Sequence, residues 1–292
     1  TFLITRLFVR ELSACPIPPY AADMAETNRT ASSIGVFDSG IGGLTVAREL
    51  IARFPNTDLV YLGDTARLPY GAKSPETVTR YAVRCVQFLI DAGVDQVVVA
   101  CNTASAHAIP KLHTEFDETP ILGVVKPGAR AAVQASKTGT IGVIGTEGTI
   151  ASNSYPEAIA AIDPHAEVIS LAAPLLVPLA EVGWLDHDVT RLTIRTYLKP
   201  LFDTSVEMDT LVLGCTHYPA LKATISDVCE ELGRPMTLVD SAEAVTSTLA
   251  TTLSPGSGAR RICVTDLPDR FHRVATTFFG EQITTVEHVD IT

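Results

Sequence analysis

The sequence predicts an α/β fold of two pseudo-symmetric domains, each a mostly parallel sheet flanked by helices, with an active site in the cleft between them. Apolar strands alternate with helical segments from Ile34 to the C-terminus. The strands are apolar along their length, which is typical of parallel sheets covered on both faces. An apolar strand that runs into a cysteine occurs once in each half, as VVVACNTAS (97–105) and LVLGCTHYP (211–219).

Length and composition limit the classes of protein that fit. The chain has 292 residues, 46% of them hydrophobic, which is enough for one large or two medium domains with packed cores. Its net charge of −11 argues against direct nucleic-acid binding, because phosphates are bound by clustered Lys and Arg. The sequence has no uninterrupted apolar run of about 18 residues, so no membrane span or membrane partner is expected.

The six cysteines, at positions 15, 85, 101, 215, 229 and 263, include no C-x-x-C pair. Their spacing predicts neither a zinc ribbon nor a disulfide framework, so we expect no metal and a reducing cytoplasmic location. We interpret Cys85, Cys229 and Cys263 as small buried hydrophobes, the usual role of a free cysteine.

The N-terminal segment differs from the rest of the chain. The sequence begins with Thr1, and Met24 opens MAETNRTASS, which resembles a natural start with a polar lead-in. A signal peptide is the less favoured interpretation, because Arg6 interrupts the apolar run. We therefore expect residues 1–31 to be an extension outside the fold.

The first half alternates strands and helices from residue 33 to residue 125. The periodicity of apolar residues predicts a helix over 43–54. Ser74 as a cap, Pro75 at the first helical position and Gly93 at the end predict a second helix over 74–93. A third helix follows Cys101 and should be disturbed near Pro110. The expected strands are 33–40, 58–64, 95–101 and 120–125.

The alternation repeats in the second half. The expected helices are 127–136, 150–162, 188–202, 218–232, 242–253 and 269–280. The expected strands are 140–146, 166–173, 210–215, 236–241, 260–266 and 284–289. We predict that residues 32–124 together with 243–292 form the first α/β domain and that 125–242 form the second.

Polar clusters follow several of the predicted strands. DSG (38–40), CNTAS (101–105), GTEGT (145–149) and CTHYP (215–219) stand at strand ends, and PYG (69–71) lies on a loop after another strand. Ligands of open α/β sheets bind beyond the C-terminal ends of the strands. Each cluster alone could be turn chemistry, but together they indicate a binding cleft.

Cys101 and Cys215 each stand where a helix is expected to begin. A helix N-terminus lowers the pKa of a thiol, so both side chains are candidate acid–base groups rather than packing residues. His217 lies two residues after Cys215 and could stabilise a thiolate or transfer a proton. It could instead be a surface or capping histidine. A zinc site is less favoured, since Cys-x-His supplies two ligands and a structural site needs four.

Asp38, Glu181 and the glycine-rich turn DSGIGGL (38–44) allow more than one interpretation. Asp38 could pair with a substrate ammonium or cap a helix. Glu181 follows an apolar stretch and could face the cleft or water. The turn is a poor dinucleotide fingerprint, because the third glycine position is Thr45. Its backbone N–H groups could still hold a carboxylate.

Five motifs, GVFDSGIGGL, GDTARLPYG, ACNTAS, PLLVPLAEVG and GCTHYP, closely resemble the glutamate racemase family of the aspartate/glutamate racemase superfamily. The resemblance runs from about Ile34 to the C-terminus. It implies a racemase without cofactor or metal that interconverts L- and D-glutamate and supplies D-glutamate for peptidoglycan. It also implies a homodimer, and by family analogy alone DNA gyrase is a candidate partner.

The resemblance also implies roles for particular residues. Cys101 and Cys215 would face the substrate Cα from opposite sides, Cys101 removing the proton of the D-isomer and Cys215 that of the L-isomer. Asp38, Glu181 and His217 match positions that assist the thiols. The implied substrate contacts are Asp38, Ser39, Tyr70, Gly71, Asn102, Thr103, Thr149, Thr216 and His217.

Other functions remain open at the level of sequence. Aspartate and hydantoin racemases belong to the same superfamily. A related decarboxylase, or a thiol acyl-transferase that uses Cys215 and His217, would need only one of the two cysteines. A binding or inhibitory module is the alternative from a different class, and the intact pair of cysteines argues against it.

Overall fold

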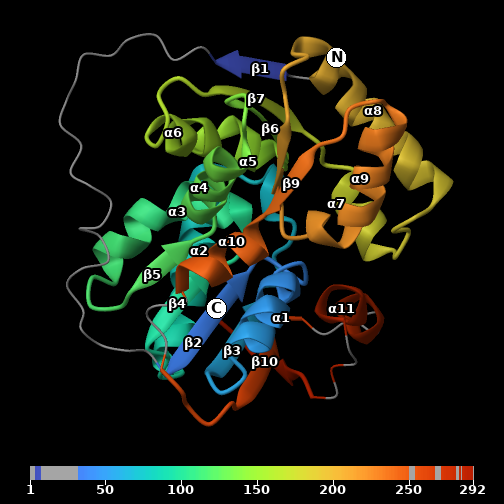
Figure 1. Ribbon diagram of the computed structural model, residues 1–292. Helices are drawn as coiled ribbons and strands as arrows, with labels where there is room; N and C mark the ends of the chain where they lie inside the picture. Colours follow the sequence, from blue (N-terminus) through green and yellow to red (C-terminus); the bar gives the residue numbers. More distant parts are fainter. Residues whose placement is uncertain are drawn as a thin grey trace.

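The computed structural model describes residues 4–7, 32–249, 254–266, 271–280, 283 and 285–291. Two sheets organise these residues, and they lie one above the other in Figure 1. The first sheet has the order β11-β10-β3-β2-β4-β5, and all its strand pairs are parallel. Its strands are β2 (Ser33–Asp38), β3 (Asp58–Gly63), β4 (Gln96–Val99), β5 (Ile121–Gly123), β10 (Arg260–Val264) and β11 (Glu287–His288).

The second sheet has the order β1-β7-β6-β8-β9 and is parallel except for β1. Its strands are β1 (Ile4–Leu7), β6 (Thr140–Gly145), β7 (Glu167–Ala172), β8 (Thr210–Gly214) and β9 (Thr237–Asp240). These two mostly parallel sheets with flanking helices confirm the predicted fold class. Apart from β1, the strands of the first sheet lie within 33–123 and 260–288 and those of the second within 140–240, while the predicted domain limits stay a prediction.

Helices cover the sheets and connect them. Those of the first half are α1 (Leu44–Arg53), α2 (Pro75–Asp91) and α3 (Asn102–Glu115), with the short 3-10 helix η2 (Tyr70–Ala72) before α2. The helices from residue 125 onward are α4 (Val125–Ala135), α5 (Glu147–Ala151), α6 (Ser154–Ala160), α7 (Leu176–Glu181), α8 (Asp188–Thr204), η3 (Tyr218–Leu221), α9 (Lys222–Glu231), α10 (Ser241–Leu249) and α11 (Phe271–Phe279). Helix α10 packs against both α1 and α4, so it joins the two halves.

Part of the N-terminal extension belongs to a sheet, contrary to the expectation that residues 1–31 lie outside the fold. Strand β1 pairs antiparallel with the edge strand β7. The unpaired N–H and C=O groups of an edge strand favour the addition of a further strand, and this accounts for the pairing. The expectation for residues 1–3 and 8–31 falls outside the described residues.

Two helices differ from the sequence prediction. Helix α3 continues through Pro110, which removes one intrahelical hydrogen bond without ending the helix. The single helix expected over 150–162 is instead split between α5 and α6. The break occurs at Asn153, whose φ of 59° is left-handed, a conformation that asparagine tolerates better than most residues. Ser74, Pro75 and Gly93 bound α2 as predicted.

The core extends from one half into the other. One cluster of buried apolar side chains includes Val36 and Val98 of the first sheet and Ile144 and Leu213 of the second. Burial of the strands on both faces explains their continuous apolar sequence. No helix among the described residues is both long and apolar enough to cross a membrane.

Gly63, the last residue of β3, tests how closely the glycine-rich turn 38–44 approaches the first sheet. A Cβ on Gly63 would overlap the backbone carbonyl oxygen of Gly40, which cannot yield as a flexible side chain can. We expect Gly63→Ala to lower the free energy of unfolding by about 1–3 kcal/mol, measured by urea denaturation.

Gly40→Ala is the matched control, because its Cβ would lie 3.4 Å from Leu68 Cδ2, an ordinary contact. Equal stability losses in the two variants would contradict the close approach of Gly40 to β3.

Candidate active site

The C-terminal ends of strands from both sheets surround one cavity of about 160 Å³. Ser39 follows β2, Cys101 follows β4, Thr146 follows β6 and Cys215 follows β8. The cavity is smaller than the roughly 300–1,000 Å³ of pockets for drug-sized ligands, so it suits a small metabolite. Its lining is Ser39, Gly40, Leu68, Pro69, Tyr70, Gly71, Ala72, Cys101, Asn102, Thr103, Thr146, Glu147, Pro174, Val177, Pro178, Glu181, Cys215, Thr216 and His217.

Cys101 is the N-cap of α3 and is almost fully buried. The backbone N–H of Ala104 donates to its Sγ over 3.5 Å. Burial, followed by the negative charge of Asp38, raises the pKa of Cys101 to about 12, while the Ser39 hydroxyl and the Ala104 N–H act in the opposite direction. The expectation that the helix N-terminus lowers this pKa is therefore wrong for Cys101, because desolvation outweighs the helix donors.

Cys215 begins a chain of three side chains. Its Sγ lies 3.8 Å from His217 Nδ1, and His217 Nε2 lies 3.1 Å from Glu181 Oε1. Burial alone would lower the pKa of His217, but the hydrogen bonds and charges of Cys215 and Glu181 raise it to about 10. His217 is therefore protonated at neutral pH, and its imidazolium lies between a thiol group and a carboxylate. Glu181 faces the cavity rather than water alone.

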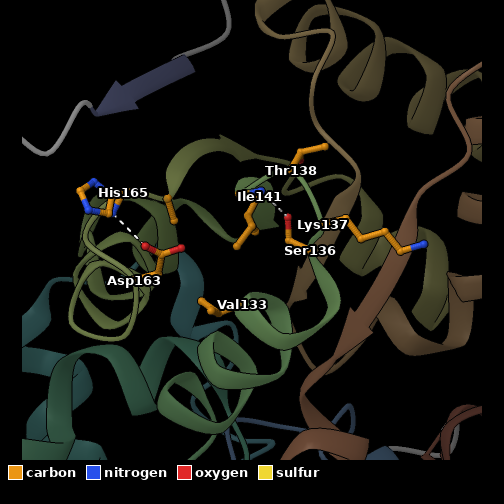
Figure 2. A pocket seen from close by; sticks show the side chains of 9 residues that line it. Val133, Ser136, Lys137, Thr138, Ile141, Asp163 and His165 are labelled. Atoms are coloured by element: carbon orange, nitrogen blue, oxygen red, sulfur yellow. Dashed lines mark hydrogen bonds between the residues drawn. The ribbon is translucent and has the colours of Figure 1, made fainter.

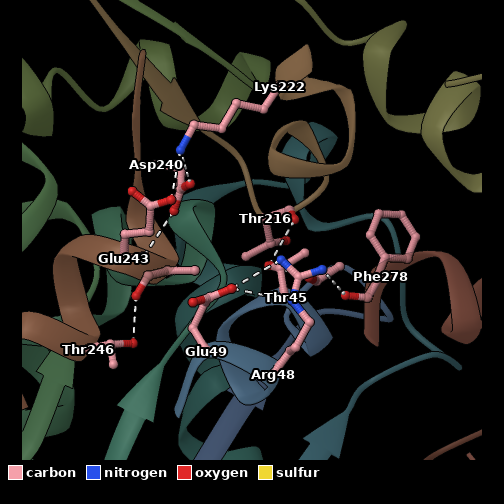
Figure 3. A network of polar contacts seen from close by, with 11 residues as sticks. Thr45, Arg48, Glu49, Thr216, Lys222, Asp240, Glu243, Thr246 and Phe278 are labelled. Atoms are coloured by element: carbon pink, nitrogen blue, oxygen red, sulfur yellow. Dashed lines mark hydrogen bonds and ion pairs between the residues drawn. The ribbon is translucent and has the colours of Figure 1, made fainter. Parts of the chain in front are cut away.

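The glycine-rich turn after β2 allows this chain to form. A Cβ on Gly42 would lie 2.5 Å from both His217 Nδ1 and Thr216 Oγ1, so only glycine lets the turn approach so closely. The hydroxyl of Thr45 also donates to the backbone carbonyl of Thr216 over 3.2 Å (Figure 3). The turn of the first half is thereby packed against the CTHYP segment of the second.

Asp38 lies behind the cavity wall and is completely buried. Its Oδ2 accepts the N–H of Gly40 at 2.9 Å, and its Oδ1 accepts the hydroxyl of Thr216 at 3.3 Å. It also accepts a hydrogen bond from the backbone N–H of Gly43, the N-cap residue of α1, so the helix-cap interpretation is compatible with the structure. Burial raises the pKa of Asp38, partly offset by the charge of His217 and by these hydrogen bonds. Its charge interacts with those of both Cys101 and His217.

The polar residues expected to contact substrate are mostly brought together. Those that line the cavity are Ser39, Tyr70, Gly71, Asn102, Thr103, Thr216 and His217. Thr149 is buried just outside this lining, with its hydroxyl 3.2 Å from that of Thr103 and 3.0 Å from that of Thr146. Thr146 also lines the cavity and caps α5. It belongs to the GTEGT motif, but it was not among the residues expected to contact substrate.

Several supporting residues were not found from the sequence. The hydroxyl of Tyr70 donates to the buried carboxylate of Asp64, which also accepts the guanidinium of Arg67 at 2.8 Å and the hydroxyl of Thr265 at 2.9 Å. This cluster holds the PYG loop against the first sheet. Asp64 and Arg67 lie within the GDTARLPYG motif, but the sequence alone did not assign them a role, and Thr265 is distant in sequence. Pro174, Val177 and Pro178 add an apolar wall to the cavity.

A second cavity, of about 280 Å³, lies at the opposite ends of β6 and β7. Figure 2 shows that the Lys137 and His165 side chains extend to opposite sides, away from Val133 and Ile141. The cavity therefore offers no converging reactive groups. Within the part of the chain that the structure describes, no group of three or more His, Cys, Asp and Glu side chains could hold a metal ion.

Comparisons of the sequence with known proteins identify the family. The family model described as Asp/Glu/Hydantoin racemase matches residues 44–249. A glutamate racemase from Geobacter metallireducens is 48% identical over 267 residues, covering 89% of this chain and 97% of the relative. The chain belongs to the Asp/Glu/hydantoin racemase family.

Solved structures agree with that assignment. A glutamate racemase isoform from Bacillus anthracis superposes with a TM-score of 0.81 at 39% identity, covering 88% of this chain and 97% of the other. The glutamate racemase of Francisella tularensis, solved in complex with D-glutamate, gives a TM-score of 0.80 at 34% identity, with coverage of 90% and 98%.

The raised pKa of His217 predicts a pH-dependent contribution to stability. The pKa in the folded state, about 10, lies above the ordinary value of 6.5. The stabilisation from protonated His217 is therefore complete below about pH 6.5 and is lost as the pH rises through about 10. We expect the difference in free energy of unfolding between the wild type and His217→Asn to be largest near pH 6 and to shrink toward pH 10.

Urea denaturation at pH 6, 8 and 10 measures this difference. His113→Asn, which removes a ring contact to the carbonyl of Ile121, is the control for the loss of a histidine hydrogen bond. A His217 contribution that is constant or grows with pH would contradict a protonated imidazole between Cys215 and Glu181.

Proposed function

We propose that this chain is a glutamate racemase that moves the Cα proton of glutamate between two cysteine thiol groups without a cofactor. The observation that supports this most strongly is that Cys101 and Cys215, from different sheets, line the same small cavity. A decarboxylase or a thiol acyl-transferase would need only one of them. The family and the glutamate racemases among its relatives favour the same reaction.

The proposed reaction is a balanced proton transfer with no redox step. The Cys215 thiolate takes the Cα proton of L-glutamate, and the bonding electron pair stays on Cα. The Cys101 thiol then delivers its proton to the opposite face. The products are D-glutamate, a Cys215 thiol and a Cys101 thiolate, and the reverse direction starts from that state.

The charges around the cavity support the starting state for the L to D direction. The His217 imidazolium, held by Glu181, lies beside the Cys215 sulfur and would interact favourably with a negative charge there. Cys101, whose pKa is raised to about 12 by burial and by Asp38, is a thiol at neutral pH. The proposed starting state therefore has Cys215 as the base and Cys101 as the proton donor, the arrangement that inversion requires.

For the reverse direction, Cys101 must lose its proton. A charged Asp38 carboxylate opposes this loss, because it raises the pKa of Cys101, so we propose that Asp38, whose own pKa is raised by burial, assists the step in its protonated form. Asp38 does not line the cavity, so its role is to change the pKa of the Cys101 thiol rather than to contact Cα. Contact between Asp38 and the substrate ammonium stays a prediction.

The α-proton of an amino acid is much less acidic than a thiol, so the cavity must stabilise the carbanionic state electrostatically. We assign this role to N–H and O–H donors around a substrate carboxylate, from Ser39, Asn102, Thr103 and Thr216. Hydroxyls and amides fixed in a buried site interact with developing charge more strongly than water-exposed ones do.

The cellular role follows from the product. We propose that the chain acts in the cytoplasm and supplies D-glutamate for peptidoglycan, and thereby for cell wall biogenesis and cell shape. A homodimer and the binding of DNA gyrase stay predictions from family resemblance.

Substitution of the cysteines tests the two-base proposal. Cys101→Ala and Cys215→Ala should each lower kcat/KM for racemisation by more than about 10³-fold, because each removes one of two obligatory proton carriers. Circular dichroism of L- and D-glutamate solutions follows the reaction directly.

Cys229→Ala is the matched control, because Cys229 is equally buried but lies on α9 in the core. Cys85 is less suitable, since its Sγ contacts the Tyr70 hydroxyl at 3.9 Å. The control should keep kcat/KM within about twofold, and the wild type should keep its activity after dialysis against EDTA. Near-normal turnover by either Cys101→Ala or Cys215→Ala would overturn the proposal.

A further inference from the structure

Asn102, the residue after Cys101, has an amide group with two distinct sides. Its Oδ1 accepts hydrogen bonds from the hydroxyls of Tyr155, at 2.8 Å, and Ser241, at 3.2 Å. Its Nδ2 is buried and has no hydrogen-bond partner within the described residues. An unpaired buried N–H₂ group costs free energy, and Asn102 lines the cavity, so a ligand acceptor is the natural partner for Nδ2.

Tyr155 reaches Asn102 from the other half of the molecule. It lies on α6, is completely buried, and packs so closely that a Cβ on Gly128 would be 3.1 Å from its hydroxyl oxygen and one on Gly214 would be 3.3 Å from its ring. Burial raises the pKa of Tyr155, so the hydroxyl keeps its proton and can donate. Gly214 directly precedes Cys215, so the tyrosine spans the distance between the two cysteine segments.

The Ser241 hydroxyl lies 3.3 Å from that of Tyr155, and Ser241 is also held by contacts of its own. It is the first residue of α10, directly after Asp240 at the end of β9. Asp240 accepts the backbone N–H of Glu243 at 2.9 Å and the ammonium of Lys222 at 2.9 Å, and Lys222 also pairs with Glu243 at 2.8 Å (Figure 3). These contacts fix the start of α10 and hence the Ser241 hydroxyl.

In the observed orientation of the amide, both hydroxyls donate to Oδ1 and use its two lone pairs. A rotation by 180° would turn both hydroxyls into acceptors of Nδ2. The rotated form would present Oδ1 to the cavity, where it would repel a carboxylate. The observed form leaves the N–H₂ group for an acceptor.

We propose that Tyr155 and Ser241 are positioning residues that orient the Asn102 amide so that Nδ2 donates to a carboxylate of the substrate. This inference rests on the proposed function for the identity of the substrate. It also gives the interface between the two halves a direct role, since Tyr155 and Asn102 come from different halves.

Tyr155→Phe removes one donor and keeps the ring, so kcat/KM for glutamate should fall about tenfold, corresponding to about 1.4 kcal/mol. Ser241→Ala should lower kcat/KM by a smaller factor. It replaces Tyr155→Phe as the test variant if Tyr155→Phe folds poorly. Tyr218→Phe is the matched control, because it removes an equally buried hydroxyl that donates to the backbone carbonyl of Ala173 at 2.8 Å. The control should keep kcat/KM within about twofold.

A double-mutant cycle separates positioning from simple structural support. If Tyr155 acts through Asn102, Tyr155→Phe should change kcat/KM by less than about twofold in an Asn102→Ala background. A tenfold loss that persists in that background would overturn the proposal, and so would an unchanged kcat/KM in the single variant.

A second readout does not depend on activity. The side-chain amide signals of Asn102 in ¹⁵N NMR spectra, assigned by their loss in Asn102→Asp, should shift or broaden in Tyr155→Phe without glutamate and stay unchanged in Tyr218→Phe. Unchanged Asn102 signals in Tyr155→Phe would overturn the positioning role. An inactive wild type would instead count against the proposed function alone.

Discussion

The rest of the site depends on the contact between Cys215, buried at the end of β8, and the imidazolium of His217, whose Nδ1 lies 3.8 Å from Sγ. Transfer of an unpaired charge out of water is costly, so buried charges in proteins need a partner. His217 has such a partner in Glu181, whose Oε1 lies 3.1 Å from its Nε2. The close packing of the glycine-rich turn against His217 and the placement of α7 beside η3 both serve this contact.

Cys101 occupies the equivalent strand end of the other sheet but has no such cation. Its neighbour is the carboxylate of Asp38, and burial raises its pKa to about 12. Two thiol groups at similar backbone positions therefore have neighbours of opposite charge, an imidazolium beside Cys215 and a carboxylate beside Cys101. The pseudo-symmetry of the fold positions the sulfurs, and we propose that the asymmetry of the charges determines which one starts as the base.

The sequence was sufficient for the parts of the site that depend on local structure. Cys101 and Cys215 were singled out because each follows an apolar strand, and parallel strands bring their C-terminal ends together. Ser39 and Thr216 came from the family resemblance, and both line the cavity. Asp38 and Thr149 lie close to the cavity without lining it, a difference that depends on side-chain packing. The role of β1 was missed because pairing at a sheet edge has no local signal.

Effects that depend on tertiary structure could not be predicted. The helix N-terminus at Cys101 is visible in the sequence, but the depth of burial that outweighs it is not. Tyr155 and Ser241 are far from Asn102 along the chain, so their shared hydrogen bonds with its amide appear only after both sheets are assembled.

The central claim, that two separate thiol groups act on opposite faces of Cα, is tested most directly by the fate of the proton. The wild type is incubated with L-glutamate in D₂O and stopped early, and deuterium at Cα of each isomer is measured by mass spectrometry after chiral separation. We predict that D-glutamate carries deuterium from the first turnover, because Cys101 delivers a solvent-derived deuteron. Remaining L-glutamate should stay almost unlabelled, because return to substrate uses the proton that Cys215 has just taken. Substantial protium at Cα in early D-glutamate, with thiol groups shown to equilibrate with solvent between turnovers, would contradict two independent bases.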